Sequence, residues 1–352
     1  MPIWPRSPRW ADHCGLGKVP AGHFHRAFGA LLLACNALPG QAEILLIGNK
    51  GEDTLSLVDM VSGRQCARLP TGKAPHEIAV SPNGKHAAVV SYGAASIDIF
   101  DIAQARLLRR INIAPNDGPH GIVWSSRDRV LAVTDRGNSI ISLNPRKGRF
   151  SALPTGQRGS HMLAVSPDRH RAYVSNILSG TVSVFDLERW AKLADIAVGG
   201  NPEGLAIAPD GMTLWVGDNS GPRVKVVDLA SQSITATLPA DTIAIRLAVS
   251  PSGDTVIASN FLSGSLTVYD ARNLRFLRSI PVSGERQAMQ VTLAWSSVLG
   301  RVLVAETGRN MIAEVDLASG HVLRRISAGR NGDGLAIAPG RCKPARDQDT
   351  GQ

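Results

Sequence analysis

The sequence predicts an all-β fold, a seven-bladed β-propeller with four antiparallel strands per blade. Three observations predict it. A short motif recurs seven times at nearly constant spacing, each repeat holds four short alternating apolar segments, and 35 Gly and 21 Pro residues punctuate all 352 residues evenly. Many short strands joined by tight turns are typical of propellers, whereas long helices need uninterrupted runs that this chain lacks.

The repeated motif is an aspartate between two apolar residues. Its central positions are separated by 42, 43, 42, 42, 42 and 46 residues, a period typical of one propeller blade. The central residues are Asp59, Asp101, Asn144, Asp186, Asp228, Asp270 and Asp316. We interpret them as caps of turns, because an Asp or Asn side chain readily accepts backbone N–H groups there.

One repeat illustrates the four strands of each blade. Apolar residues alternate with polar ones over 205–208, 213–217, 224–228 and 234–238, and turn residues separate these segments. The phase of the repeats also predicts how the ring closes. Residues 44–48 match a second strand and residues 333–339 match a first strand, so one blade combines three N-terminal strands with a C-terminal innermost strand.

The first 42 residues have the features of a secretory signal peptide. Four basic residues precede the apolar segment 27–34, and the small residues Gly40 and Ala42 precede a cleavage site at Glu43. The alternative is lipid attachment at Cys35, after Leu-Leu-Ala. We therefore expect removal of residues 1–42, a propeller over 43–340, a disordered tail over 341–352, and a periplasmic or secreted, monomeric protein.

Charge and motifs exclude several classes of protein. The formal charge of +9 includes four basic groups and one acid within residues 1–42, so the rest of the chain carries +6, scattered and without an aromatic stripe. Nucleic-acid binding is therefore not expected. The chain lacks Cys-x-x-Cys-His, Gly-x-Ser-x-Gly, His-Glu-x-x-His, phosphate-loop and dinucleotide motifs, and no apolar run after residue 42 approaches the ~20 residues of a membrane span.

Two cysteines remain after the signal segment. Cys66 starts the outermost strand of the closing blade, and Cys342 follows its innermost strand at the same end. We predict a disulfide bond between them in an oxidising compartment, with two free thiols as the alternative.

The candidate site lies where the innermost strands begin, at one mouth of the central channel. At one aligned position the seven repeats carry His76, His120, His161, Glu203, Ile245, Val291 and Asp333, and Arg246 lies one residue further on. Converging imidazoles and carboxylates suit a zinc or copper ion, an axial ligand of a haem-type cofactor, or general acid–base work. An organic ligand or peptide, or a merely solvated rim, are the alternatives. Trp124 and Trp295 are expected to pack between blades, and His86 to face solvent.

The repeats resemble the bacterial and archaeal propeller proteins named for a Tyr-Val-Thr-Asn signature. The signature stands here as Ala-Tyr-Val-Ser-Asn at 172–176, Leu-Trp-Val-Gly-Asp at 214–218 and Val-Ile-Ala-Ser-Asn at 256–260, and the resemblance covers 43–340. It implies the fold but leaves function open, since such propellers serve as binding modules, enzymes and cofactor carriers.

The sequence thus favours an exported binding or scaffold protein whose channel mouth takes a ligand or a protein partner, without assigned catalytic residues. Two alternatives stay open. One is a metal- or haem-type cofactor-binding propeller of a periplasmic redox pathway, with His76, His120 and His161 around the bound centre. The other is a lactonase- or lyase-like enzyme that uses the same histidines as acid and base.

Overall fold

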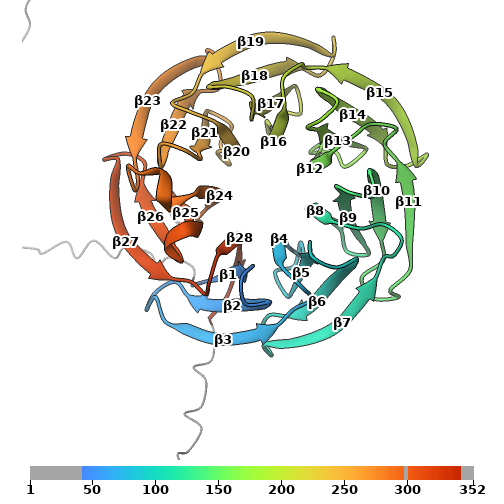
Figure 1. Cartoon of the computed structure of the whole chain (residues 1–352), viewed down its shortest axis with the longest axis vertical. Coiled ribbons are helices and arrows are strands. Elements are labelled where there is room, and N and C mark those ends of the chain that lie inside the picture. The colour runs from blue at the N-terminus through green and yellow to red at the C-terminus, as the bar shows by residue number, and fades with distance from the viewer. Residues whose placement is uncertain (1–41, 297–299, 342–352) are drawn as a thin grey trace, which may run out of the picture. The chain divides into compact units, whose positions relative to one another are not determined.

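The computed structural model describes residues 42–296 and 300–341, which form seven four-stranded antiparallel sheets. The sheets are arranged as blades around a central axis, and β4, β8, β12, β16, β20, β24 and β28 are the innermost strands (Figure 1). The predicted seven-bladed propeller is confirmed. Apart from strands, the described residues contain two short 3-10 turns, η1 (Arg286–Ala288) and η2 (Thr307–Arg309).

Each blade runs from an innermost strand at the channel to an outermost strand at the rim. In that order the strands are β4 (Pro75–Val80), β5 (His86–Ser91), β6 (Ser96–Asp101), β7 (Arg106–Asn112); β8 (Pro119–Ser126), β9 (Arg129–Thr134), β10 (Ser139–Leu143), β11 (Phe150–Pro154); β12 (Ser160–Val165), β13 (Arg171–Asn176), β14 (Thr181–Asp186), β15 (Ala191–Ala197); β16 (Pro202–Ile207), β17 (Thr213–Asp218), β18 (Arg223–Asp228), β19 (Ser233–Pro239); β20 (Ala244–Val249), β21 (Thr255–Asn260), β22 (Ser265–Asp270), β23 (Arg275–Pro281); β24 (Gln290–Trp295), β25 (Arg301–Glu306), β26 (Met311–Asp316), β27 (His321–Ser327); and β28 (Gly332–Pro339), β1 (Glu43–Asn49), β2 (Thr54–Asp59), β3 (Gln65–Pro70).

The last blade closes the ring as the repeat phase predicts. Its sheet has the order β28-β1-β2-β3, and β28 pairs with β1 in a register that sets Ala338 opposite Ile44. A C-terminal strand thus covers the edge of the first N-terminal strand, which would otherwise expose unpaired backbone groups.

The position of a strand within its blade explains its composition. Middle strands such as β1 and β17 are buried on both faces between neighbouring blades, whereas outermost strands such as β19 are largely exposed. Apolar clusters accordingly lie between adjacent blades, and Trp124 and Trp295 belong to two of them. Their predicted role in packing between blades is confirmed.

The repeated aspartates cap turns, as predicted. Asp228, for example, accepts the backbone N–H of Ser231 at 2.7 Å, and Asn144 accepts that of Lys147 at 2.9 Å in the one repeat that lacks the aspartate. The other five, Asp59, Asp101, Asp186, Asp270 and Asp316, accept backbone N–H groups in the same turn.

Some sequence predictions fall outside the described residues, namely most of the signal segment with Cys35, and the tail with Cys342. Cys66 is in a disulfide bond, and its predicted pairing with Cys342 stays a prediction. Among the described residues, no helix has the length and apolar character needed to span a membrane.

Candidate functional site

Every innermost strand carries a one-residue bulge near its start. In β4 the pairing shifts between Pro75 and Ile78, and the other six blades shift at the equivalent place. A bulge re-aims side chains, and two consecutive positions per blade thereby reach the channel mouth. The first is the aligned position of the sequence prediction, which runs from His76 in β4 to Asp333 in β28. The second position holds Glu77, Gly121, Met162, Gly204, Arg246, Thr292 and Gly334.

The six predicted site residues form one continuous cluster. His76 Nε2 lies 3.3 Å from Asp333, and the His76 and His120 rings have centroids 4.1 Å apart. His120 is followed by His161, with centroids 3.7 Å apart. His161 Nε2 then lies 3.6 Å from Glu203, which pairs at 3.1 Å with Arg246. The sequence therefore placed these residues together correctly; their ligand-binding role stays a prediction.

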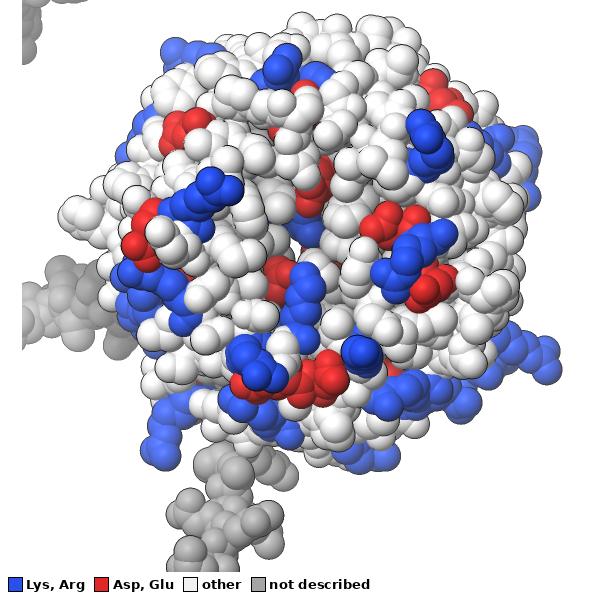
Figure 2. Space-filling view, viewed as in Figure 1, with Lys and Arg blue, Asp and Glu red and all other residues white. Residues whose placement is uncertain are grey.

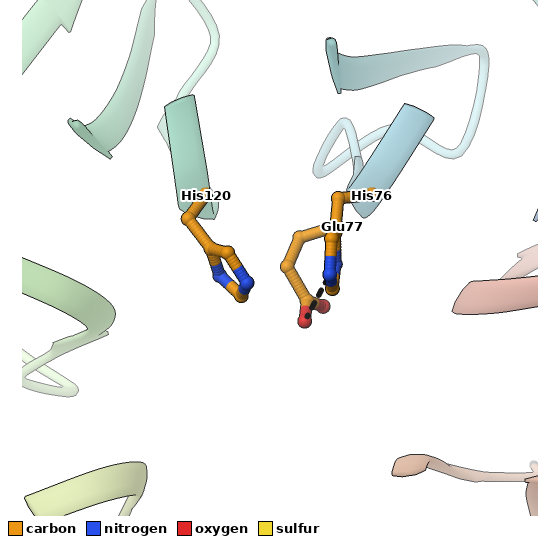
Figure 3. A group of neighbouring side chains, drawn as sticks. All are labelled: His76, Glu77 and His120. Atoms are coloured by element: carbon orange, nitrogen blue, oxygen red, sulfur yellow. Dashed lines mark ion pairs between the residues drawn. The ribbon is translucent and has the colours of Figure 1, made fainter. Parts of the chain in front are cut away.

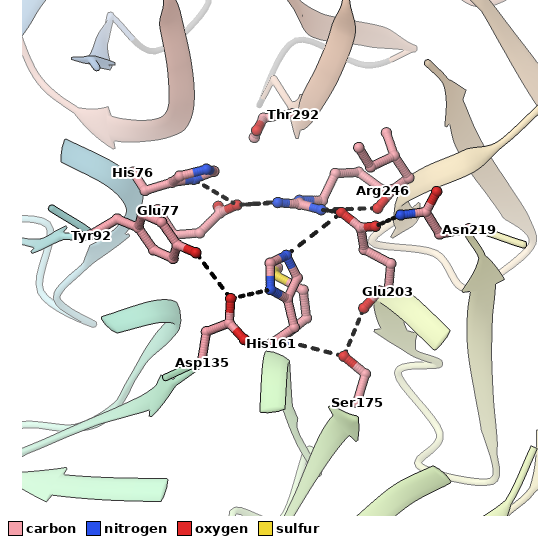
Figure 4. A network of polar contacts seen from close by, with 12 residues as sticks. His76, Glu77, Tyr92, Asp135, His161, Ser175, Glu203, Asn219, Arg246 and Thr292 are labelled. Carbon is pink, nitrogen blue, oxygen red and sulfur yellow. Dashed lines mark hydrogen bonds and ion pairs between the residues drawn. The ribbon is translucent and has the colours of Figure 1, made fainter. Parts of the chain in front are cut away.

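Arg246 crosses the channel and joins distant blades. Its guanidinium donates to Glu77 at 2.9 Å and to Glu203 at 3.1 Å, and all three side chains are almost completely buried (Figure 4). Burial alone would raise the pKa of Glu77, but Arg246 and His76 outweigh it and lower that pKa to about 2. The two carboxylates in turn raise the pKa of Arg246 despite its burial. All three groups are therefore charged at neutral pH.

Sequence analysis missed a second ring of residues at the same mouth. The residue that follows each second strand faces the start of the innermost strand, and four of these residues enter the cluster: Lys50, Tyr92, Asp135 and Asn219. Tyr92 donates to Asp135 at 3.0 Å, and Asn219 donates to Glu203 at 2.5 Å. Lys50 lies 2.8 Å from His76 Nε2 and donates to Asp333 at 3.2 Å. Only their position in the sequence marks these residues. Each directly follows the last residue of a second strand, which is Asn in β1, Ser in β5, Thr in β9 and Asp in β17.

His120 and His161 differ in protonation. Burial and the neighbouring imidazoles of His161 and His76 hold the pKa of His120 well below its usual value, so His120 is neutral. Burial also opposes protonation of His161, but the flanking carboxylates of Asp135 and Glu203 raise its pKa. The Nδ1 atoms of His76, His120 and His161 are buried and have no hydrogen-bond partner among the described residues.

One group of side chains could hold a metal ion. Among residues 42–296 and 300–341, ligand atoms of His76, Glu77 and His120 lie within 4.8 Å of one another, and all three residues are buried (Figure 3). Two imidazoles and a carboxylate suit a zinc-like ion. The group differs from the predicted His76–His120–His161 set: Glu77 joins it, and His161 instead lies between Asp135 and Glu203, at 3.7 and 3.6 Å.

Charges of both signs surround the mouth. Figure 2 shows basic and acidic residues interspersed on the visible face, with some of each inside the central hollow. Within the cluster, Glu77 and Glu203 pair with Arg246, and Asp333 pairs with Lys50. Asp135 lies beside His161. The mouth therefore presents ligand atoms of several kinds rather than one sign of charge.

Comparison with known proteins identifies the family. The family model described as "Lactonase, 7-bladed beta-propeller" matches residues 29–243. A relative from Pseudomonas aeruginosa, a dihydro-heme d1 dehydrogenase, is 26% identical over 220 residues, which are 61% of this chain and 40% of that protein. The chain thus spans less than half of that relative's length.

Two solved structures share the fold. One is a functionally unknown protein from Desulfotomaculum acetoxidans, with a TM-score of 0.73, 14% identity, and coverage of 86% of this chain and 99% of that one. The other is the dihydro-heme d1 dehydrogenase NirN in complex with DHE, with a TM-score of 0.61, 13% identity, and coverage of 83% and 74%. Membership of the Tyr-Val-Thr-Asn repeat group stays a prediction. Because the family model matches more than half of the residues, the chain belongs to the lactonase family of seven-bladed β-propellers.

Proposed function

We propose that this protein is a cofactor-binding propeller that holds a metal centre at its channel mouth through His76, Glu77 and His120. The observation that carries the proposal is the His120 imidazole, which is buried, neutral and without a partner at Nδ1, beside a second imidazole and an ionised carboxylate. A buried polar atom without a partner is costly, and a bound metal would remove that cost.

The protonation states of the donors favour metal binding at neutral pH. Metal ligands must be deprotonated, so a site whose groups are already deprotonated loses no metal affinity to competition from protons. The lowered pKa of His120 keeps its imidazole neutral, and the pKa of Glu77, about 2, keeps its carboxylate ionised. The pairing of Glu77 with Arg246 at 2.9 Å fixes that carboxylate at the mouth, as partners of metal ligands generally do.

The metal can arrive as a free divalent ion or within a haem-type group. The relative named as a dihydro-heme d1 dehydrogenase favours the second source. The residues fit such a group, because His120 would offer a neutral nitrogen to its metal and Lys50 would offer a cation to a carboxylate substituent. A bound haem-type group would supply electron-transfer chemistry at its metal, while His120 would hold it and Lys50 would orient it.

Elemental analysis and absorption spectroscopy of the purified protein test this proposal. We expect about one metal per chain after reconstitution with Zn²⁺, Cu²⁺ or haem, and loss of that metal in His120→Ala and His76→Ala. His321→Ala, an exposed histidine at the start of β27, is the matched control. A visible absorption band identifies the haem-type source, and metal without a band identifies the free ion. Equal metal content in folded His120→Ala protein, or no uptake from any source, contradicts the proposal.

A second candidate function is hydrolysis of a lactone. One observation favours it: adjacent imidazoles, His120 and His161, have pKa values shifted in opposite directions, as expected of a base and an acid that act together. In this role His120 would take a proton from water and His161 would donate one to the leaving oxygen. Lactone turnover by metal-free protein, lost in both His120→Ala and His161→Ala, would support this function over the first.

Export to the periplasm is part of the proposal and is supported by the N-terminal sequence pattern alone. Fractionation of cells that produce the full chain tests it. We expect the mature protein in the periplasm, with an N-terminus at Glu43. Cytoplasmic protein that retains residues 1–42 would contradict export, and a lipid-modified Cys35 would replace cleavage at Glu43.

A further inference from the structure

We infer a second binding site, independent of the channel mouth, that takes a small planar aromatic anion. The site is a groove of about 770 Å³ between the β4–β7 and β8–β11 blades. Its Ser81–Asn83 wall follows the end of β4, whereas His76 lies at the start of β4. The groove therefore opens on the face of the ring opposite the histidine cluster.

The size and lining of the groove suit a small organic molecule. Its volume falls within the range typical of small-molecule sites, roughly 300 to 1,000 Å³. Apolar side chains and basic groups from both blades alternate around it. The lining residues are Ser81, Pro82, Asn83, His86, Ile99, Leu108, Arg109, Trp124, Arg127, Pro145 and Arg146.

Two aromatic rings form one wall. His86 stacks on Trp124 with centroids 6.2 Å apart and an interplanar angle of 21°. His86 is half-buried, so it faces solvent in part. Trp124 is 9% exposed, and its buried Nε1 has no hydrogen-bond partner among the described residues. Five of the seven blades carry Val or Ile at this register, and the remaining blade carries Trp295, so a large ring here occurs in two of the seven blades.

Two guanidinium groups at the groove lack carboxylate partners. Arg146 pairs with Asp128 at 2.8 Å, but Arg109 and Arg127 form no ion pair with any residue that the structure describes. Arg109 reaches from β7 to the next blade, since a Cβ on Gly148 would lie 3.3 Å from its Nη1. Free guanidinium groups beside stacked aromatic rings are well suited to a carboxylate or sulfonate on an aromatic ring system.

A second groove in the same molecule serves as a contrast. It lies between the β12–β15 and β16–β19 blades and has a volume of about 450 Å³. Its lining carries three carboxylates, Asp168, Asp210 and Asp228, with one arginine, Arg171. The basic character of the first groove is therefore a property of its own residues and not of the propeller architecture.

Isothermal titration calorimetry with 1-naphthalenesulfonate tests the inference, and 1-naphthalenemethanol is the uncharged probe of similar shape. We expect saturable binding of one sulfonate per chain and binding of the alcohol weaker by about tenfold, as charge-assisted hydrogen bonds imply. The double variant Arg109→Gln/Arg127→Gln should lose at least about tenfold in affinity for the sulfonate. Arg106→Gln, on the same strand but outside the groove, is the matched control.

Three outcomes would overturn the inference: no saturable binding of the sulfonate, equal affinity in the double variant and the control, or equal affinity for the two probes. Trp124→Val removes a largely buried ring and is expected to destabilise the protein. The arginine variants change exposed side chains and keep the fold, so they test the inference without that loss of stability. His76→Ala/His120→Ala should bind the sulfonate as the wild type does. Failure of the metal proposal would therefore leave this inference untouched, and the converse also holds.

Discussion

The rings of His120 and His161 lie with centroids only 3.7 Å apart, yet their pKa values are shifted in opposite directions. The difference arises from what surrounds each ring. His161 has Asp135 and Glu203 within ion-pair distance, whereas His120 lies between two imidazoles and has no carboxylate within that distance among the described residues. A proton shared by this stack therefore resides on His161.

Asp135→Asn should lower the pKa of His161, because it removes one of the two carboxylates that stabilise the imidazolium. Histidine side-chain NMR as a function of pH measures this directly. We expect His120 to stay neutral throughout the range in which His161 titrates. His321, exposed on β27, is the internal control and should not shift. An unchanged His161 titration in the variant would contradict the assignment.

Arg246→Met should strongly destabilise the protein at neutral pH. It leaves Glu77 and Glu203 as buried carboxylates without their shared cation, a change that typically costs about 3 to 5 kcal/mol. Urea denaturation measures the loss. The triple variant Arg246→Met/Glu77→Gln/Glu203→Gln should recover most of it, because no charge of the triad remains buried. Wild-type stability of Arg246→Met would show that the triad is not needed.

Acid should weaken the fold partly through Glu77. Its pKa in the folded protein, about 2, lies below its usual value, so its contribution to stability is present above about pH 4.5 and is lost as the pH falls toward 2. Each pH unit by which a pKa is lowered on folding corresponds to about 1.4 kcal/mol of stability, so the loss is large enough to measure. Glu77→Gln should flatten the dependence of the unfolding free energy on pH between 6 and 3. A slope identical to that of the wild type would refute this origin.

Lys50→Met should tighten metal binding at the mouth by about tenfold or more, since it removes a cation 2.8 Å from His76 Nε2 that repels a divalent ion and competes for the imidazole nitrogen. Titration with Zn²⁺ by calorimetry compares the two proteins. Lys73→Met, an exposed residue outside the cluster, provides the control. Weaker binding in Lys50→Met would mean that Lys50 supports the site instead.

Reduction of the Cys66 disulfide should lower the unfolding free energy by about 2 to 4 kcal/mol, the usual range for a structural disulfide. Thermal denaturation with and without reductant measures the effect, and Cys66→Ser should match the reduced protein. Peptide mapping under non-reducing conditions identifies the partner. Linkage to Cys342 would confirm the predicted pairing, and a different partner would replace it.

The blades could be predicted because the same pattern of strands and turns recurs seven times in the sequence. The capping aspartates gave the register, and the phase difference between Ile44 and Asp333 gave the closure of the ring. Aligning one position also brought His76, His120 and His161 together correctly. These features are local or periodic, so a sequence pattern records them directly.

The rest of the site depends on backbone geometry that the pattern does not record. The bulge in β4 brings Glu77 to the mouth together with His76, although strict alternation would put them on opposite faces. The equivalent bulge in β20, between Ala244 and Arg246, brings Arg246 to the mouth although it lies one residue off the aligned position, and there it pairs with Glu77 across the ring. Tyr92 and Asp135 come from turns, and their contact depends on how adjacent blades are angled.

The cluster at the channel mouth is complete only when the last strand of the chain has docked in the closing blade. Asp333 lies on β28 and Lys50 directly follows β1, so the Lys50–Asp333 ion pair forms only when the last strand docks on the first. A chain still being synthesised has no Asp333 beside His76 and leaves the edge of β1 open. The Lys50–Asp333 ion pair is therefore a contact of the closed ring alone, and it marks a molecule whose synthesis and folding have finished.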